Sequence, residues 1–187
     1  MSAPERRSPG ARPRTAHTAA LTPAELRAVR SLLYDAFDGD FGAEDWDHCL
    51  GGLHVLVHDA RGLAAHGSVV MRRVRLRGRW LRTGYVEAVA VRRDVRRTGL
   101  GGLVMDAVEE TVTRAYDLGA LSASDDGARL YAARGWRAWA GTISALGPDG
   151  AVRLPEEEGS TYVWPVPAAA SDPDAELLFD WRDGDVL

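Results

Sequence analysis

The hydrophobic pattern of this 187-residue chain changes its period near residue 53, and that change limits the folds available to the chain. Before it, apolar residues recur with the spacing of one helix face, whereas residues 53–91 alternate between apolar and polar positions as half-buried strands do. Turn signals at 59–62 and 77–79 divide that stretch into three or four strands. Connections this short join antiparallel neighbours, so we expect an antiparallel meander.

Helical segments stand on both sides of the meander. Residues 21–37 are predicted to form a helix that has Thr22 as its N-cap, Pro23 in its first turn and Glu25 completing a capping box. Beyond the meander, residues 100–118 have the apolar spacing of a second helix. Each helix has an apolar face to pack against the strands.

Shorter elements complete the pattern, with Gly119 as the expected C-terminal stop of the second helix. They are a strand at 120–124, a helix at 125–135 and strands at 136–146 and 161–166. This order predicts one α/β (α+β) domain with a mixed, largely antiparallel central sheet flanked by helices. Residues 1–17 lack apolar periodicity and are rich in Pro and Arg, so we expect a mobile extension there and the folded domain at 18–187.

Composition and residue spacing exclude several classes of protein. The net charge of −4 argues against a general nucleic-acid binder. No apolar run is long enough to cross a bilayer, and no secretory signal is recognisable, so we expect a cytoplasmic protein without a membrane partner. The single cysteine, Cys49, is expected to be a small apolar residue rather than a nucleophile. We expect no metal, because no metal-ligand spacing connects His48, His54, His58 and His66.

The stretch VRRDVRRTGLGG, residues 91–102, combines arginines and glycines between a strand and a helix. Backbone N–H groups at a helix N-terminus bind phosphate, and Gly99, Gly101 and Gly102 allow the chain to approach an anion closely. The loop is neither a Walker loop nor a Rossmann fingerprint, because it lacks the sequence that ends the first and the glycine spacing of the second. From spacing alone, a glycine-rich turn with solvated arginines fits as well as an anion site.

Acidic residues are concentrated in three places. Residues 38–47 hold five carboxylates, residues 156–158 hold three, and residues 180–185 hold three more. Each cluster alone is typical of a solvated loop. Together with a loop that is a candidate anion site, the three clusters favour a substrate that carries positive charge.

Three segments resemble the GNAT acetyltransferases. Arg96–Gly101 resembles the family's Arg/Gln-x-x-Gly-x-Gly/Ala loop, Val89–Val91 resembles the apolar strand end before it, and Tyr131–Trp136 resembles a later Tyr-x-x-x-Gly-Phe stretch. The resemblance implies the GNAT fold and acetyl-CoA as co-substrate, with its pyrophosphate in the loop. The residues that it assigns to acetyl-CoA are Val89, Ala90, Val91, Arg96, Arg97, Thr98, Gly99, Leu100, Gly101 and Gly102.

Longer stretches resemble one family within that superfamily, the aminoglycoside 2′-N-acetyltransferases. They include RTGYVEAVAVR, AYDLGALSAS, RLYAARGW and the closing DWRDGDVL, and the similarity extends over residues 18–187. The resemblance implies transfer of an acetyl group to the 2′-amino group of an aminoglycoside or a related cationic amino sugar, and hence antibiotic resistance. It also implies a homodimer. The substrate residues that it assigns are Asp40, Asp45, Glu87, Ala88, Ser122, Glu157, Trp181, Asp185 and Leu187.

Two residues carry the expected chemistry. Glu87 interrupts an apolar strand, where burial of a charged side chain costs free energy unless the charge is compensated. Its position in the family pattern implies that it is a general base that acts through ordered water. Tyr131 is the matching general acid, which protonates the leaving thiolate. Without the resemblance, alternation also allows an outward-facing Glu87, and Tyr131 fits equally well as a core tyrosine.

Two departures from the family pattern bear on substrate preference. Glu156–Glu158 stand where related sequences tend to have aspartates, and Leu187 ends the chain where an aromatic residue is often found. Alternative readings are a GNAT enzyme that acetylates another cationic amine, such as a polyamine, a cell-wall amino sugar or a self-made antibiotic, and an inactive GNAT-like module that binds acetyl-CoA or a cationic ligand. Intact Glu87 and Tyr131 argue against the inactive module.

Overall fold

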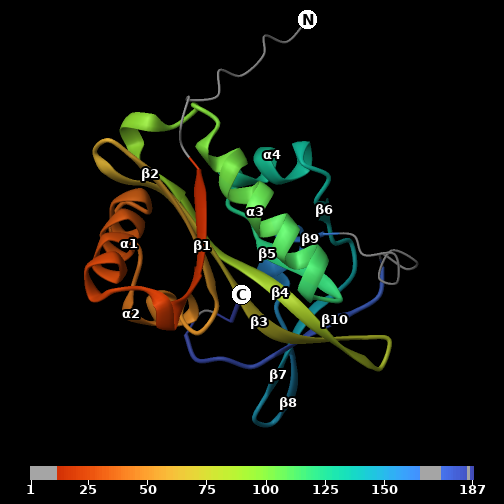
Figure 1. The fold of residues 1–187 in the computed structure, drawn as a ribbon. Helices are drawn as coiled ribbons and strands as arrows, with labels where there is room; N and C mark the ends of the chain where they lie inside the picture. The colour runs from red at the N-terminus through yellow and green to blue at the C-terminus, as the bar shows by residue number, and fades with distance from the viewer. Residues whose placement is uncertain (1–11, 165–173, 185) are drawn as a thin grey trace, which may run out of the picture. The chain divides into compact units, whose positions relative to one another are not determined.

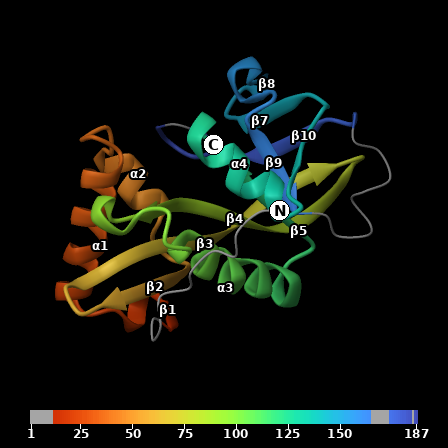
Figure 2. The same ribbon diagram turned by 90° about the horizontal axis from the view of Figure 1, so that it is seen from above.

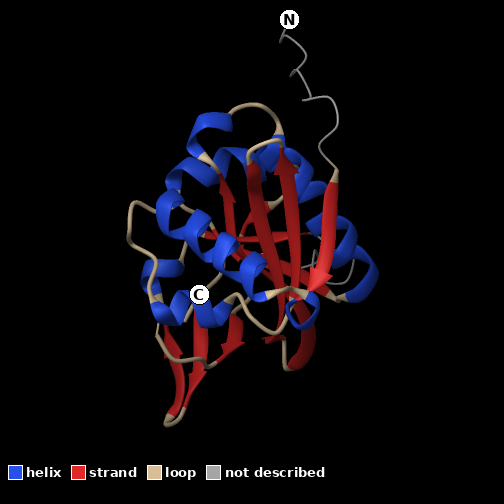
Figure 3. Ribbon diagram, turned by 60° about the vertical axis from the view of Figure 1, so that its left-hand side comes forward, coloured by secondary structure: helices blue, strands red, loops and turns tan. Residues whose placement is uncertain are grey.

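The computed structural model describes residues 12–164, 174–184 and 186–187 (Figure 1). They form two compact units, and β3, β4 and α3 contribute residues to both. We call residues up to 70 together with 86–110 the first unit, and residues 71–85 together with those from 111 onward the second unit. Figure 3 shows the mixture of helices and strands that was predicted for the fold class.

The first unit combines a small sheet with helices. In it, β1 pairs with β2 and β2 pairs with β3, both antiparallel, and β4 follows β3 in the strand order. The meander predicted from residue 53 onward is therefore present. The elements of this unit are β1 (Pro13–His17), a 3-10 turn (Thr18–Ala20), α1 (Pro23–Ala36), α2 (Ala43–His48), β2 (Leu53–Asp59), the first part of β3 (Gly62–Leu76), the last part of β4 (Arg79–Val91), a 3-10 turn (Arg93–Val95) and the start of α3 (Leu100–Ala115).

Helix α1 begins as its sequence predicts. The Thr22 hydroxyl accepts a hydrogen bond from the Glu25 N–H at 3.2 Å, and the Glu25 carboxylate accepts one from the Thr22 N–H at 2.8 Å. The Thr22 hydroxyl also donates to the Glu25 carboxylate at 2.9 Å, and the two bonds that this carboxylate accepts hold the pKa of Glu25 below its ordinary value. The buried face of the helix presents Val29, Leu32 and Leu33 to the core, so local capping and apolar spacing together fix its place.

The N-terminal boundary of the first unit differs from the prediction. Residues up to 17 were expected to be a mobile extension, whereas Pro13–His17 form β1 along the edge of β2. A five-residue strand with mostly exposed side chains leaves little trace in the hydrophobic pattern. Its backbone hydrogen bonds to β2 hold it instead.

The second unit contains the remaining strands. The described strands belong to one mixed ten-stranded sheet with the order β6-β9-β5-β4-β3-β10-β7-β8, and β1 and β2 lie off this path. The β4–β5 and β7–β10 pairs are parallel, whereas β3–β10, β5–β9, β6–β9 and β7–β8 are antiparallel; Figure 2 labels these strands except β6. The elements that complete this unit are β5 (Leu118–Ser122), α4 (Asp125–Ala133), β6 (Arg137–Ala138), β7 (Ile143–Gly147), β8 (Gly150–Arg153), a 3-10 turn (Pro155–Glu157), β9 (Thr161–Trp164) and β10 (Leu177–Asp180).

Gly119 has a different role from the one predicted. Helix α3 ends at Ala115, and Gly119 lies within β5, opposite Gly84 on one side and Trp164 on the other. A Cβ at Gly119 would lie 2.7 Å from the Cβ of Trp164 and 2.9 Å from a methyl group of Val112. Close packing in the sheet, rather than a left-handed helix end, therefore requires glycine here.

Candidate active site

The loop between β4 and α3 lies entirely in the first unit and has the backbone features of an anion site. Gly99 has φ of +87°, and a Cβ placed on it would meet no heavy atom within 4 Å, so that side of the loop is open. Helix α3 begins at Leu100, and the first N–H groups of a helix have no acceptor within it and carry positive partial charge. These features fit a bound phosphate.

Arg96 adds a full positive charge to the same loop. Its guanidinium donates to the carbonyl oxygens of Val91 and Ala36, each at 3.2 Å. Because a carbonyl oxygen carries no net charge, these bonds orient the guanidinium without neutralising it. The Thr98 hydroxyl donates to the carbonyl of Val95 at 2.6 Å and fixes the turn before the glycine. The loop therefore fits the pyrophosphate of coenzyme A.

Strand β4 leads into this loop and carries Glu87, Ala88 and Val89, which are all partly exposed. Ala88 has φ of +48°, a left-handed conformation that costs a non-glycine residue about 1–3 kcal/mol. The apolar alternation of β4 gives no sign of this feature, and sequence reasoning missed it. Residues held in such a conformation gather at functional sites.

Two side chains of β3 approach the backbone of β4 at that point. The Ser68 hydroxyl donates to the carbonyl of Glu87 at 3.3 Å, and the Nδ1 atom of His66 lies 3.3 Å from the carbonyl oxygen of Ala88. His66 in turn lies 2.9 Å, Nε2 to Nδ1, from His54 on β2. The histidines that the sequence presented as scattered thus include a buried pair that contacts the candidate site.

Burial keeps this pair uncharged. Neither ring is exposed, and desolvation lowers the pKa of His54 to about 4 and that of His66 to about 3. The hydrogen bond between His66 and the carbonyl of Ala88 acts in the opposite direction on the pKa of His66, but burial outweighs it. Both rings are therefore neutral at physiological pH.

The acidic residues of the first unit differ in what they contact. Asp45 caps α2, because its carboxylate accepts the N–H of Gly42 at 2.6 Å. Asp40 is exposed in the loop that follows α1, where it is accessible to a cationic ligand. Asp38 pairs with Arg93. Of these three, the surroundings of Asp40 agree best with the expected substrate role.

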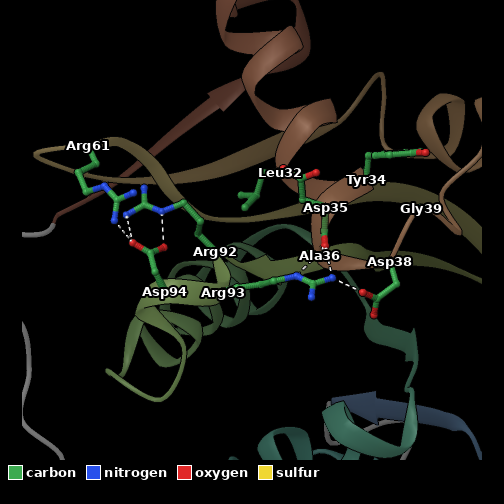
Figure 4. A pocket seen from close by; sticks show the side chains of 10 residues that line it. All are labelled: Leu32, Tyr34, Asp35, Ala36, Asp38, Gly39, Arg61, Arg92, Arg93 and Asp94. Carbon is green, nitrogen blue, oxygen red and sulfur yellow. Dashed lines mark hydrogen bonds and ion pairs between the residues drawn. The ribbon is translucent and has the colours of Figure 1, made fainter.

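A pocket of about 530 Å³ lies beside the C-terminal half of α1 (Figure 4). Arg92 donates to Asp94 at 2.6 Å and to Asp59 at 2.5 Å, and these bonds raise its pKa. Arg61 also pairs with Asp94 and Arg93 with Asp38, and three arginines and three aspartates line the pocket, so its walls have no net formal charge. None of the site residues expected from the sequence lines it. Its lining residues are Leu32, Tyr34, Asp35, Ala36, Asp38, Gly39, Arg61, Arg92, Arg93 and Asp94.

Tyr131 lies in the second unit, on α4, with 8% of its surface exposed. The rings of Trp136 and Tyr162 pack against it, with centroids at 6.2 and 6.4 Å. Burial raises the pKa of Tyr131 to about 12. The phenol is therefore protonated at neutral pH and can donate a hydrogen bond.

Two of the expected substrate residues come together in the second unit. The Ser122 hydroxyl, at the end of β5, donates to a carboxylate oxygen of Glu157 at 2.7 Å, and the Ser160 hydroxyl donates to the same oxygen at 3.0 Å. Their separation in the sequence is 35 residues, so only the fold connects them. Glu158 instead pairs with Arg153 at 2.8 Å.

The C-terminal segment is anchored by an arginine that sequence reasoning missed. Arg72, which is 3% exposed, donates through Nε to the Asp180 carboxylate at 2.8 Å and through another nitrogen to the carbonyl of Val186 at 2.5 Å. Its guanidinium also packs over the rings of Tyr85 and Phe179. Arg72 shares the buried phase of β3 with Val74 and Leu76, so strand alternation contains a signal for its burial.

The expected residues of this segment are only partly described. Trp181 follows β10 and is partly exposed, and Leu187 ends the chain half-buried. Asp185, expected to bind substrate, lies outside the described residues. Within the described part of the chain, no His, Cys, Asp or Glu side chains gather in a group of three that could hold a metal ion. No helix in that part has the length and apolarity needed to span a membrane.

Comparison with known proteins identifies the family. Residues 24–136 match the Acetyltransferase (GNAT) family. An aminoglycoside 2′-N-acetyltransferase of Mycolicibacterium fortuitum is 47% identical to this chain over 176 residues, which cover 92% of this chain and 90% of that protein. The chain belongs to the aminoglycoside 2′-N-acetyltransferase family of GNAT proteins.

Solved structures agree with this family on the fold. The GNAT protein YhbS from Escherichia coli, crystallised in complex with CoA, has a TM-score of 0.65 at 18% identity and covers 96% of this chain and 93% of its own. ElaA from Escherichia coli has a TM-score of 0.59 at 17% identity, covering 83% and 99%. The predicted GNAT fold is thus confirmed.

The acetyl donor of this acetyltransferase is acetyl-CoA, as the sequence predicted. The loop between β4 and α3 offers a phosphate group the open side of Gly99, the N-terminus of α3 and the charge of Arg96. Which residues hold the ligand remains a prediction, and it is testable at Gly99.

We expect Gly99→Asp to weaken coenzyme A binding about ten-fold relative to Gly99→Asn. The two side chains have the same shape and both tolerate a left-handed backbone, but only aspartate repels a pyrophosphate. A like charge at a distance near 6 Å from the anion costs about 1.4 kcal/mol, which is a factor of ten in the dissociation constant. Calorimetric titration with coenzyme A measures the difference. Equal affinities of the two variants for coenzyme A would show that the pyrophosphate does not bind in this loop.

Proposed function

We propose that the protein transfers the acetyl group of acetyl-CoA to the 2′-amino group of aminoglycosides and thereby confers resistance to them. The observation that carries this proposal is the 47% identity to an aminoglycoside 2′-N-acetyltransferase over 92% of this chain. The exposed Asp40 and the hydrogen-bonded Ser122–Glu157 pair support it, since carboxylates attract the ammonium groups of an aminoglycoside. Cytoplasmic location and a homodimer are further expectations from the family resemblance.

Glu87 acts as the general base, through ordered water, in the mechanism that we propose. It removes one proton from the ammonium group, because only a neutral amine can attack a carbonyl. Bound acetyl-CoA supplies the thioester carbonyl, where a C–N bond forms as the C–S bond breaks. Tyr131 donates its phenolic proton toward the departing sulfur. The second proton lost by the nitrogen balances the proton gained by sulfur, so one proton is released to solvent per transfer.

The proposed substrate is tested by acceptors that differ at one position. Wild-type enzyme is assayed for release of the coenzyme A thiol with aminoglycosides that carry a 2′-amino group and with matched aminoglycosides that carry a 2′-hydroxyl group. We expect turnover only with the first set, and a product acetylated at the 2′ nitrogen by NMR. Turnover with polyamines alone would favour the alternative of another cationic amine. Binding of acetyl-CoA without any turnover would favour an inactive binding module.

Removal of the base should change the pH profile. We expect Glu87→Gln to lower kcat about 100-fold near pH 7 and to recover part of the loss as pH rises, because more of the amine is then neutral without help. Steady-state rates from pH 6 to 10 measure this, with Glu44→Gln on α2 as a control for loss of a carboxylate. A profile for Glu87→Gln with the shape and height of wild type would show that Glu87 is not the base.

Removal of the Tyr131 hydroxyl should lower kcat by a factor that does not depend on pH. We expect Tyr131→Phe to lower kcat about ten-fold by the same factor at every pH between 6 and 9, because a hydroxyl with a pKa of about 12 stays protonated throughout that range. Tyr162→Phe is the matched control, since it removes a hydroxyl from a neighbouring ring. A ratio of wild-type to variant rates that changes between pH 7 and 9 would contradict the role of Tyr131.

Substitutions of two neighbouring glutamates distinguish a carboxylate that binds substrate from one that only contributes surface charge. We expect Glu157→Gln to raise the KM for an aminoglycoside about five-fold and to leave the KM for acetyl-CoA unchanged, because one carboxylate that faces an ammonium group is lost. Glu158→Gln removes the same charge one residue later, from a carboxylate already paired with Arg153, and should leave both constants near wild type. Equal effects of the two variants would place Glu157 outside the sugar site.

A further inference from the structure

Side chains of β3 hold two consecutive carbonyl groups of β4. Ser68 donates to the carbonyl of Glu87, and His66 lies at hydrogen-bond distance from the carbonyl of Ala88, the left-handed residue of the strand. Ser68 and His66 are both fully buried. They stand two residues apart on the same face of β3, so one strand face reaches both carbonyls.

Behind His66 runs a chain of hydrogen-bonding groups that we call the histidine chain: Thr18, His54 and His66. The Thr18 hydroxyl lies 2.8 Å from Nε2 of His54 and accepts the N–H of Gly51 at 3.0 Å. Nδ1 of His54 lies 2.9 Å from Nε2 of His66. The histidine chain thus connects the partly buried loop around Thr18 to the backbone of β4.

The donor and acceptor of each hydrogen bond in the histidine chain can be assigned by starting from the carbonyl of Ala88. A carbonyl oxygen only accepts, so Nδ1 of His66 carries the proton that it donates to Ala88. A neutral imidazole has one N–H, which makes Nε2 of His66 an acceptor and Nδ1 of His54 its donor. Nε2 of His54 then accepts the single proton of the Thr18 hydroxyl at 2.8 Å, in preference to the carbonyl of Gly52, which lies farther from that hydroxyl at 3.3 Å. Both rings must therefore be the Nδ1–H tautomer.

The charge state of the rings supports this assignment. Desolvation lowers the pKa of both histidines well below neutrality, so each ring is uncharged and has one N–H. Over the pH range of an amine acetyltransferase assay, the histidine chain holds one fixed set of protons. It does not act as a switch in that range.

The backbone at Ala88 needs such support. A left-handed alanine is strained and persists only where its surroundings over-determine it. A buried hydrogen bond to its carbonyl fixes the peptide plane between Ala88 and Val89, and Ser68 fixes the plane between Glu87 and Ala88. The orientation of these two planes sets the direction of the Glu87 side chain before them and of the Val89 backbone after them.

We propose that His66, supported by His54 and Thr18, is a positioning residue that fixes the strand at Ala88 and so aims both Glu87 and the acetyl-CoA-binding end of β4. The part that concerns Glu87 rests on the proposed function. The part that concerns the backbone of β4 does not, because acetyl-CoA binding is tested without an acceptor.

Two substitutions at His66 separate its two hydrogen bonds. In His66→Asn the amide nitrogen is bonded to Cγ, as Nδ1 is, and keeps the donor to Ala88 while losing the bond to His54. In His66→Gln the terminal amide reaches the position of Nε2 and keeps the acceptor for His54 while losing the donor to Ala88. We expect His66→Gln to lower kcat about ten-fold or more and His66→Asn to stay within about three-fold of wild type, since small misplacements of catalytic groups are costly.

The melting temperatures of the two variants distinguish a positioning role of His66 from a purely structural one. His66→Asn leaves the buried N–H of His54 without its acceptor, so its melting temperature should be the lower of the two. A purely structural role predicts that activity follows melting temperature, which is the opposite order from ours. Equal kcat values in the two variants, or kcat that follows the melting temperature, would overturn the proposal.

Two measurements remain valid whatever the acceptor is. Calorimetry should find coenzyme A binding to His66→Gln weakened about three-fold or more, with His66→Asn near wild type. The ¹⁵N imidazole shifts of the wild type, assigned among five histidines with single variants, should show Nδ1–H for His54 and His66. If no aminoglycoside is acetylated, the proposed function fails while these two results still decide the inference. An Nε2–H tautomer at His66, or coenzyme A affinities that do not separate the variants, would overturn it.

Discussion

In the proposed mechanism, strand β4 contacts two chemical partners, the amine and acetyl-CoA, with one continuous backbone. Side chains along a regular strand alternate between faces, so neighbouring residues cannot be aimed independently. The left-handed conformation at Ala88 breaks that constraint between Glu87 and Val89–Val91, which in the proposed mechanism face the amine and acetyl-CoA respectively. The same strand then runs into the loop whose glycine and arginine fit a pyrophosphate.

The arginines of this chain fall into groups according to their acceptors. Arg92 and Arg93 pair with carboxylates, so their charges are neutralised and they brace the start of the loop. Arg72 is buried and donates hydrogen bonds to a carboxylate and to backbone carbonyl groups of the C-terminal segment. Arg96 has carbonyl partners, which orient it but leave its charge for an anion. Since the basic residues of this chain are all arginine, the partners rather than the residue type distinguish structural from ligand-binding positions.

Features governed by local rules were predictable from the sequence. The capping box of α1, the glycine loop, the meander and the buried stripe of α3 depend on residues within a few positions of one another. Features that depend on pairing across the fold were not predictable in the same way. Strand β8 is mostly exposed and β10 has four residues, so neither has a clear period. The bond of Ser122 to Glu157 joins residues whose spacing carries no motif.

Between these extremes stand residues whose signal was present but ambiguous. Arg72 occupies the buried phase of an alternating strand, and a charge at such a position requires partners. His54 and His66 lie on neighbouring antiparallel strands, where residues near one another in register come into contact. Gly119 was assigned to a helix end because glycine favours that place, although close packing in a strand demands glycine equally.

The high pKa of Tyr131 limits how the thiolate can acquire its proton. A phenol with a pKa of about 12 is a weaker acid than an alkyl thiol, for which the cysteine side chain with a pKa near 8.5 is the reference, so complete proton transfer to the thiolate is unfavourable. A phenolate in this buried position would therefore take a proton back at once. Tyr131 is better suited to donate a hydrogen bond as charge develops on sulfur, passing its proton on only as the amine nitrogen loses one. Its contribution to the proposed mechanism then depends on its placement and burial by α4, Trp136 and Tyr162 rather than on its acidity.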